Sequence, residues 1–124
     1  MNDLIEKARL VQENAYTPIK DIKVGAALRT STGEIFTGCN VQNSSYGATI
    51  CAEHVAIAKM VSEGYRNIAE IAVVSNLEDF ITPCGICRQV IHEFSPNARV
   101  ISTNLKGEIK EYSIKELLPE AFKL

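Results

Sequence analysis

The length of the chain, 124 residues, predicts a single domain over residues 1–124 that is large enough to bury a hydrophobic core. Its apolar fraction of 46% and charged fraction of 23% are ordinary for a globular protein. The net charge is only −2 and the basic residues are scattered singly, which argues against a nucleic-acid partner, because a polyanion is normally bound by a basic patch.

The first residues, Met1 to Lys7, carry charges from Asp3 onward and contain no apolar signal core. No apolar run approaches the length needed to span a bilayer, so we expect no membrane partner. These features predict a cytoplasmic protein. In that reducing environment, the four cysteines indicate metal binding or catalysis rather than disulfide bonds.

Apolar periodicity and turn residues predict nine elements in the order α-β-β-α-β-α-β-β-α. Apolar residues recur at helical spacing from Leu4 to Ala15, and Pro18 follows them as a stop signal. Ser31-Thr-Gly33 separates two β-type runs and is typical of a hairpin, and Ser113-Ile-Lys-Glu116 is a capping-box pattern. Helices are expected at residues 3–15, 51–63, 84–94 and 113–119, and strands at residues 24–30, 34–41, 68–75, 98–102 and 108–112.

The predicted second helix, residues 51–63, is apolar on most sides, and we expect it to be central and buried. The run at residues 68–75 is rich in isoleucine, alanine and valine, which is typical of a strand covered on both faces. With the order of the elements, these features predict an α/β fold in which a sheet of about five strands lies between helical layers.

Three of the four cysteines lie in two short motifs, Cys51-Ala-Glu53-His54 and Pro83-Cys84-Gly-Ile-Cys87-Arg88. Thiolates are strong ligands for Zn²⁺, and Cys84 and Cys87 at the start of one helix can present both sulfurs to an ion that Cys51 reaches from another. Three ligands leave a coordination position open for water, as in catalytic zinc sites. Glu53 is placed to handle the proton of that water, so the motifs indicate metal-assisted hydrolysis.

Two structural interpretations compete with this one. Cys84 and Cys87 could instead form a redox pair, and Glu53 could be a solvated helix carboxylate. The fourth cysteine, Cys39, lies outside both motifs and is interpreted as a small buried apolar residue.

Around the motifs, nearly the whole chain resembles the small cytidine deaminase family. The resemblance rests on segments that occur in family order: Val24-Gly-Ala-Ala27, Phe36-Thr-Gly-Cys-Asn-Val-Gln-Asn43, Ser45-Tyr-Gly47, Cys51-Ala-Glu53, Pro83-Cys-Gly-Ile-Cys-Arg-Gln89 and Glu116-Leu-Leu-Pro119. It implies a three-layer α/β/α sandwich with a mixed sheet, and one zinc ion per subunit bound by Cys51, Cys84 and Cys87. It also implies that Glu53 transfers protons during hydrolytic deamination of free cytidine or deoxycytidine, a reaction of pyrimidine salvage.

The resemblance also implies residues for the substrate pocket, and here the chain departs from the family. The family binds the sugar hydroxyls with an asparagine and a glutamate, which correspond to Asn40 and Gln42. A glutamine lacks the charge-assisted bond of a carboxylate, so sugar recognition is either weakened or kept with this variation. The base-stacking aromatic residue of the family corresponds to Ile22, whose aliphatic side chain can pack on the ring but cannot stack as an aromatic ring does.

Three further positions carry expectations from the family. His54 stands where the family has an arginine that donates to a zinc-bound thiolate, so it either tunes the zinc more weakly or has no such role. Arg88 is expected to donate to a sulfur. Phe122 matches an aromatic residue that reaches into a neighbouring subunit, which implies a homotetramer with shared pockets, whereas a packed core phenylalanine is the competing interpretation.

Three alternative functions remain open at this point. The first is a deaminase of another 4-aminopyrimidine, such as blasticidin S or an N4-substituted cytidine, which the changes at Ile22, Gln42 and His54 motivate. The second is a non-catalytic zinc-binding module, against which Glu53 argues. The third is a nucleic-acid editing deaminase, which the charge balance disfavours.

Overall fold

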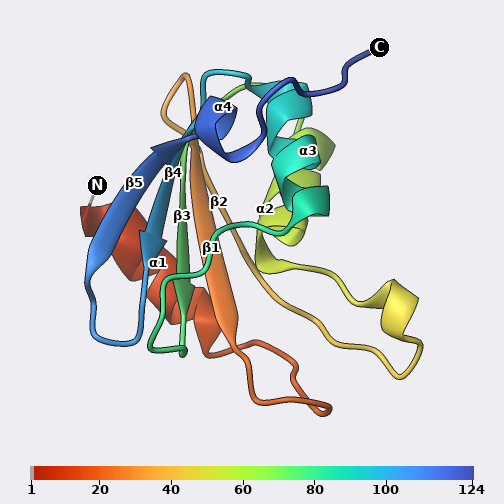
Figure 1. Ribbon diagram of the computed structural model, residues 1–124, viewed down its shortest axis with the longest axis vertical. Helices are drawn as coiled ribbons and strands as arrows, with labels where there is room; N and C mark the ends of the chain where they lie inside the picture. The colour runs from red at the N-terminus through yellow and green to blue at the C-terminus, as the bar shows by residue number, and fades with distance from the viewer. Residues whose placement is uncertain (1) are drawn as a thin grey trace.

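The computed structural model describes residues 2–124 and contains a sheet with helices on both faces (Figure 1). The strands are β1 (Val24–Thr30), β2 (Ile35–Cys39), β3 (Ile68–Ser75), β4 (Arg99–Thr103) and β5 (Ile109–Ser113). The helices are α1 (Asn2–Gln12), α2 (Ala52–Ser62), α3 (Gly85–Phe94) and α4 (Ile114–Leu117), with a 3₁₀ turn, η1 (Tyr46–Ala48).

The five strands lie in the spatial order β2-β1-β3-β4-β5. β3 and β4 run parallel, and every other neighbouring pair runs antiparallel. Helix α1 covers one face of the sheet, and α2 and α3 lie side by side on the other (Figure 1). The predicted three-layer α/β/α sandwich with a mixed sheet is therefore confirmed.

The central strands separate two hydrophobic clusters. In β3, Ile71 and Val73 belong to the larger cluster under α2 and α3, whereas Ala72 and Val74 belong to the smaller cluster under α1. All four side chains are fully buried, because successive residues of a strand point to opposite faces and both faces are covered by helices. This burial agrees with the prediction for residues 68–75.

Two glycines mark the points where helices approach the sheet most closely. A Cβ atom on Gly25 would lie 2.0 Å from the carbonyl oxygen of Ala8 in α1. One on Gly38 would lie 2.5 Å from the carbonyl oxygen of Ala52 and 2.6 Å from the amide nitrogen of Ala56, both in α2. Backbone therefore rests on backbone at these points, and only glycine leaves room for the contact.

Some predicted elements end earlier in the structure. Helix α1 stops at Gln12 rather than at residue 15, because the amide of Asn14 bonds the carbonyl of Val11 in a tighter turn. Strand β2 stops at Cys39, and beyond it Val41 forms isolated bridges to Tyr16 and Ile50. At the other end of the chain, the predicted capping box that opens α4 is confirmed.

The expectation that the second helix is buried on most sides is wrong for the isolated chain. Helix α2 turns one face to the sheet and leaves His54, Ala58 and Lys59 exposed. Ile50, Val55 and Ser62 join these three residues in lining an apolar surface groove of about 320 Å³. The helix lies in an outer layer of the sandwich, where a single sheet can cover only one of its faces.

The chain between β2 and α2 projects from the rest of the molecule and carries η1 at its far end (yellow in Figure 1). Tyr46 in this segment is 74% exposed, and Ile50 is 42% exposed. Across residues 2–124, the structure contains no helix with both the length and the apolar character needed to cross a bilayer.

Candidate metal and active site

Three cysteines lie at the N-termini of two neighbouring helices. Cys51 is the N-cap residue of α2, Cys84 is the N-cap residue of α3, and Cys87 follows in the first turn of α3. A helix N-terminus carries the equivalent of about half a positive charge, which favours the thiolate form of a nearby cysteine. The sandwich therefore brings residues that are distant in the sequence into one electropositive corner.

The spacing of the sulfur atoms fits a single zinc ion. The Sγ atoms of Cys51 and Cys84 are 3.6 Å apart, and the three Sγ atoms all lie within 4.8 Å of one another. Tetrahedral zinc with Zn–S bonds of about 2.3 Å requires sulfurs roughly 3.8 Å apart. Cys51, Cys84 and Cys87 can therefore bind one zinc ion, and three ligands leave a fourth position for a small molecule.

The sulfur atoms also influence one another's protonation. A hydrogen bond from Cys87, with smaller contributions from Cys84 and the nearby charge of His54, lowers the pKa of Cys51 to about 6 although burial acts in the opposite direction. The same contact with Cys51, together with burial, raises the pKa of Cys87. The cluster thus contains a thiolate at neutral pH, the form in which cysteine binds metals.

Glu53 lies beside this cluster, in the first turn of α2, and is only 4% exposed. Burial raises the pKa of its carboxyl group to about 7, and the charge of Cys51 adds to the increase, whereas a hydrogen bond to its backbone opposes it. A carboxyl group with a pKa near neutrality can both accept and return a proton. It is not the solvated helix carboxylate of the competing interpretation.

A cavity of about 200 Å³ opens beside the sulfur atoms. It brings Cys51, Cys84 and Glu53 together with two residues from the chain after β2, Asn40 and Gln42. The other lining residues are Val24, Thr49, Ile50, Ala52, Ile81 and Thr82. The cavity thus combines a group suited to proton transfer, a possible metal site and polar side chains that can orient a small ligand.

Comparison with known proteins identifies the family. The sequence model of one protein family, described as the cytidine and deoxycytidylate deaminase zinc-binding region, matches residues 1–103 of this chain. The chain belongs to this family.

Individual relatives extend the match along the chain. It is 47% identical over 120 residues to a cytidine deaminase from Sporosarcina psychrophila, with 96% of this chain and 88% of the relative covered. The crystal structure of a cytidine deaminase from Burkholderia pseudomallei superimposes with a TM-score of 0.94 at 46% identity, and 98% of each chain is covered. A blasticidin-S deaminase from Bacillus cereus is 35% identical over 104 residues, covering 77% of this chain and 74% of the relative.

Ile22, His54 and Phe122 are among the residues that the cytidine deaminase resemblance implicated and that do not line the cavity. Ile22 packs against the larger hydrophobic cluster. His54 lies on the exposed groove of α2, although its charge still acts on Cys51. Phe122 is 69% exposed, so it is not the packed core phenylalanine of the competing interpretation.

Arg88 supports the cysteine loop through contacts other than the expected one. Its Nε donates to the carbonyl of Pro83 at 2.7 Å, its Nη1 to the carbonyl of Leu117 at 2.7 Å, and its Nη2 to the Oγ1 of Thr82 at 2.6 Å. None of these three bonds goes to a sulfur. The guanidinium group instead ties the segment before Cys84 to the end of α4.

Ile81 and Thr82 also line the cavity, although neither is a predicted site residue. They directly precede the Pro83-Cys84 motif, and this adjacency was the signal that could have identified them. A fully buried serine of β4, Ser102, donates to the carbonyl of Ile81 at 2.5 Å and holds this wall against the sheet.

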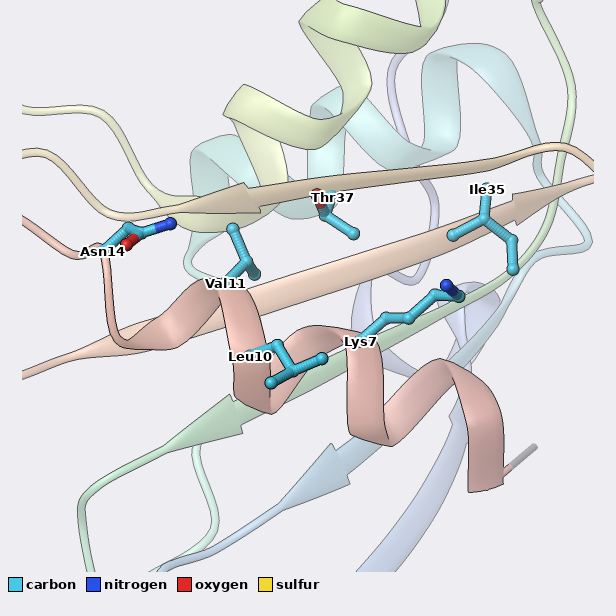
Figure 2. Close-up of a pocket in the computed structure, with 6 residues that line it drawn as sticks. All are labelled: Lys7, Leu10, Val11, Asn14, Ile35 and Thr37. Atoms are coloured by element: carbon cyan, nitrogen blue, oxygen red, sulfur yellow. The ribbon is translucent and has the colours of Figure 1, made fainter.

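A larger pocket of about 390 Å³ lies between α1 and the edge strand β2 (Figure 2), and it shares no lining residue with the cavity beside the sulfur atoms. Its lining residues are Lys7, Leu10, Val11, Asn14, Ile35 and Thr37. Because none of them is a cysteine, a histidine or a carboxylate, this cavity lacks the groups that deamination requires.

Proposed function

We propose that this protein hydrolytically deaminates cytidine and deoxycytidine to uridine and deoxyuridine. Water supplies the new oxygen at C4 of the pyrimidine, and the 4-amino group leaves as ammonia. The observation that carries the proposal is the buried carboxyl group of Glu53 in the same cavity as Cys51 and Cys84, in a chain of the cytidine deaminase family.

In this proposal, Cys51, Cys84 and Cys87 bind zinc and Glu53 moves the protons. Zinc in a site with three protein ligands supplies a Lewis acid that makes water a better nucleophile near neutral pH. Glu53 takes a proton from the attacking water and delivers it to the ring nitrogen next to C4. It then takes the proton of the new C4 hydroxyl group and passes it to the departing amine, so that C4 becomes a carbonyl as ammonia leaves. Its pKa of about 7 supports both the acceptance and the return of the proton.

The remaining residues of the site shape the pocket and support the cysteines. Asn40 and Gln42 form the polar wall beside the sugar, and Ile22 stabilises the β1 side of the pocket from the core behind it. His54 lowers the pKa of Cys51 through its charge, and Arg88 holds the cysteine loop. We further propose a cytoplasmic role in pyrimidine salvage, in keeping with a small nucleoside as the substrate.

A second candidate substrate class uses the same chemistry. Gln42 and Ile22 differ from the family's glutamate and aromatic residue, and one relative of this chain is a blasticidin-S deaminase. These observations favour testing blasticidin S and N4-substituted cytidines alongside the simple nucleosides.

The decisive experiment gives the zinc-loaded protein cytidine, deoxycytidine, cytosine, N4-methylcytidine and blasticidin S, with a Glu53→Gln variant as the blank. Turnover is followed by the ultraviolet change of the pyrimidine and by the released amine, which is methylamine for N4-methylcytidine and ammonia for the others. We expect rapid release from cytidine and deoxycytidine and little from free cytosine, which lacks the sugar. Poor turnover of both nucleosides with good turnover of blasticidin S or N4-methylcytidine would instead assign the second substrate class. No turnover of any of these compounds would contradict the proposed chemistry.

We also propose a homotetramer in which Phe122 reaches a neighbouring pocket. The apolar groove on α2, the projecting segment with Tyr46 and the exposed Phe122 support this assembly, because large apolar side chains are usually covered in the native state. Sedimentation equilibrium at micromolar concentration is expected to give four times the mass of the 13.6 kDa chain. A monomer at that concentration would contradict the shared pocket.

A further inference from the structure

Residues 13–23 join α1 to β1 and contain no helix or strand beyond an isolated bridge at Tyr16. This segment is bound to the chain that follows β2. The amide of Tyr16 donates to the carbonyl of Asn40 at 3.1 Å, and the amide of Gln42 donates to the carbonyl of Tyr16 at 2.9 Å. The position of this segment, and hence of the nearby cavity wall, therefore depends on residues 40–42.

The side chain of Gln42 makes the closest set of contacts with this segment. Its Oε1 accepts from the amide of Ile19 at 2.9 Å and from the amide of Lys20 at 3.1 Å. Its Nε2 donates to the carbonyl of Lys20 at 2.8 Å. The orientation of the amide is unambiguous, because two N–H donors face one end and a carbonyl faces the other.

The side chain of Asn40 also bonds this backbone, at Ile22 and Val24. Its Oδ1 accepts from the amide of Val24 at 2.9 Å, and its Nδ2 donates to the carbonyl of Ile22 at 2.7 Å. Two side-chain amides that line the cavity are thus bonded to the backbone that leads into β1.

We propose that Gln42 is a positioning residue that clamps Ile19 and Lys20 against the cavity wall, and that it is not an acceptor for a sugar hydroxyl. A carboxamide oxygen has two lone pairs, and both are directed to backbone amides here. Only one N–H of the Gln42 side chain is left for a ligand, so this side chain can donate to a substrate but cannot accept from it.

A carboxylate at this position would weaken the clamp by removing one of its three hydrogen bonds. It could still accept from the two amides, but its second oxygen would face the carbonyl oxygen of Lys20, where Nε2 now donates. Two acceptors at hydrogen-bond distance repel each other and leave both unsatisfied. The glutamine is therefore suited to this segment in a way that the family's glutamate is not.

This inference rests on the proposed function for its kinetic test, and it has a second readout that does not. Gln42→Met keeps the length of the side chain but removes all three bonds. We expect faster hydrogen–deuterium exchange in the peptide covering residues 17–22 and a KM roughly three- to tenfold higher for cytidine and 2′,3′-dideoxycytidine alike. The ratio of kcat/KM between the two nucleosides is expected to stay at its wild-type value.

Two further variants complete the test. Gln42→Glu is expected to speed exchange in the same peptide, because it loses the bond to Lys20. Gln12→Met removes a bond to the carbonyl of Lys23 from outside the cavity, and it should leave both KM values and the exchange of Ile19 and Lys20 unchanged.

Unchanged exchange in Gln42→Met would overturn the clamp. A collapse of the preference for cytidine over the dideoxynucleoside in Gln42→Met would show that Gln42 bonds the sugar directly, and it would overturn a role confined to positioning the segment. If the wild-type protein turned over neither nucleoside, the proposed function would fail, while the exchange experiment would still decide whether Gln42 is a clamp.

Discussion

Replacing Glu53 by glutamine is expected to lower kcat by roughly 100- to 10,000-fold while zinc content and melting temperature stay close to the wild type. Glutamine has the same shape, but it cannot carry a proton from water to the pyrimidine. The fold should tolerate the change, because burial disfavours the charged form of this carboxyl group and glutamine carries no charge. Ammonia release, metal analysis and thermal unfolding of the same preparation measure the three quantities.

The matched control for this variant is Glu63→Gln, at the exposed C-cap of the same helix. It removes one carboxylate from α2 without touching the cavity, so its kcat should equal that of the wild type. Retained turnover in Glu53→Gln would remove Glu53 from the mechanism, and loss of zinc from this variant would indicate a ligand role that we do not propose.

Cys84→Ala is expected to eliminate stoichiometric zinc and to lower the melting temperature in zinc-containing buffer. Two remaining thiolates leave the ion without its third protein ligand, and the free energy of metal binding also contributes to the free energy of folding. Cys84 is the most informative ligand to replace because it is exposed, so alanine creates no internal cavity. Cys87 is buried, and its replacement would combine a packing defect with metal loss.

Cys39→Ala provides the control for Cys84→Ala, because Cys39 lies in β2 outside the sulfur cluster. This variant should keep its zinc, as measured by mass spectrometry of the native protein or by a chromogenic chelator. A chelator should then lower the melting temperature of Cys39→Ala and leave that of Cys84→Ala unchanged. Stoichiometric zinc in Cys84→Ala would refute the ligand set.

Much of the fold could be predicted from the sequence because local signals and burial agree. The isoleucine- and valine-rich run of β3 is buried on both faces, and the capping box at Ser113 opens α4 as the pattern indicated. The exposure of α2 could not be predicted, because its apolar composition does not distinguish contact with the sheet from contact with another molecule. Periodicity describes which residues avoid water, but not what covers them.

The candidate site also has parts that the sequence predicts and parts that it does not. The cysteine motifs led to a compact sulfur cluster because ligand spacing is encoded locally in each helix start. The contacts of Gln42 and Arg88 could not be predicted, since they depend on backbone groups 22 and 29 residues away that only the folded chain brings near. Ile22 shows the same limitation, because its packing against the core follows from the path of the segment before β1.

The backbone contact between Gly38 and α2 fixes the position of the site relative to strand β2. Because Gly38 has no side chain, the backbone of β2 lies directly against the backbone at the start of α2, and this contact sets the distance between them. Cys51 and Glu53 lie at that start of the helix, so their separation from the sheet depends on this backbone contact. Gly38 itself is sensitive to substitution, because a single methyl group there would clash with the backbone of Ala52 and Ala56 and displace Cys51 and Glu53 together.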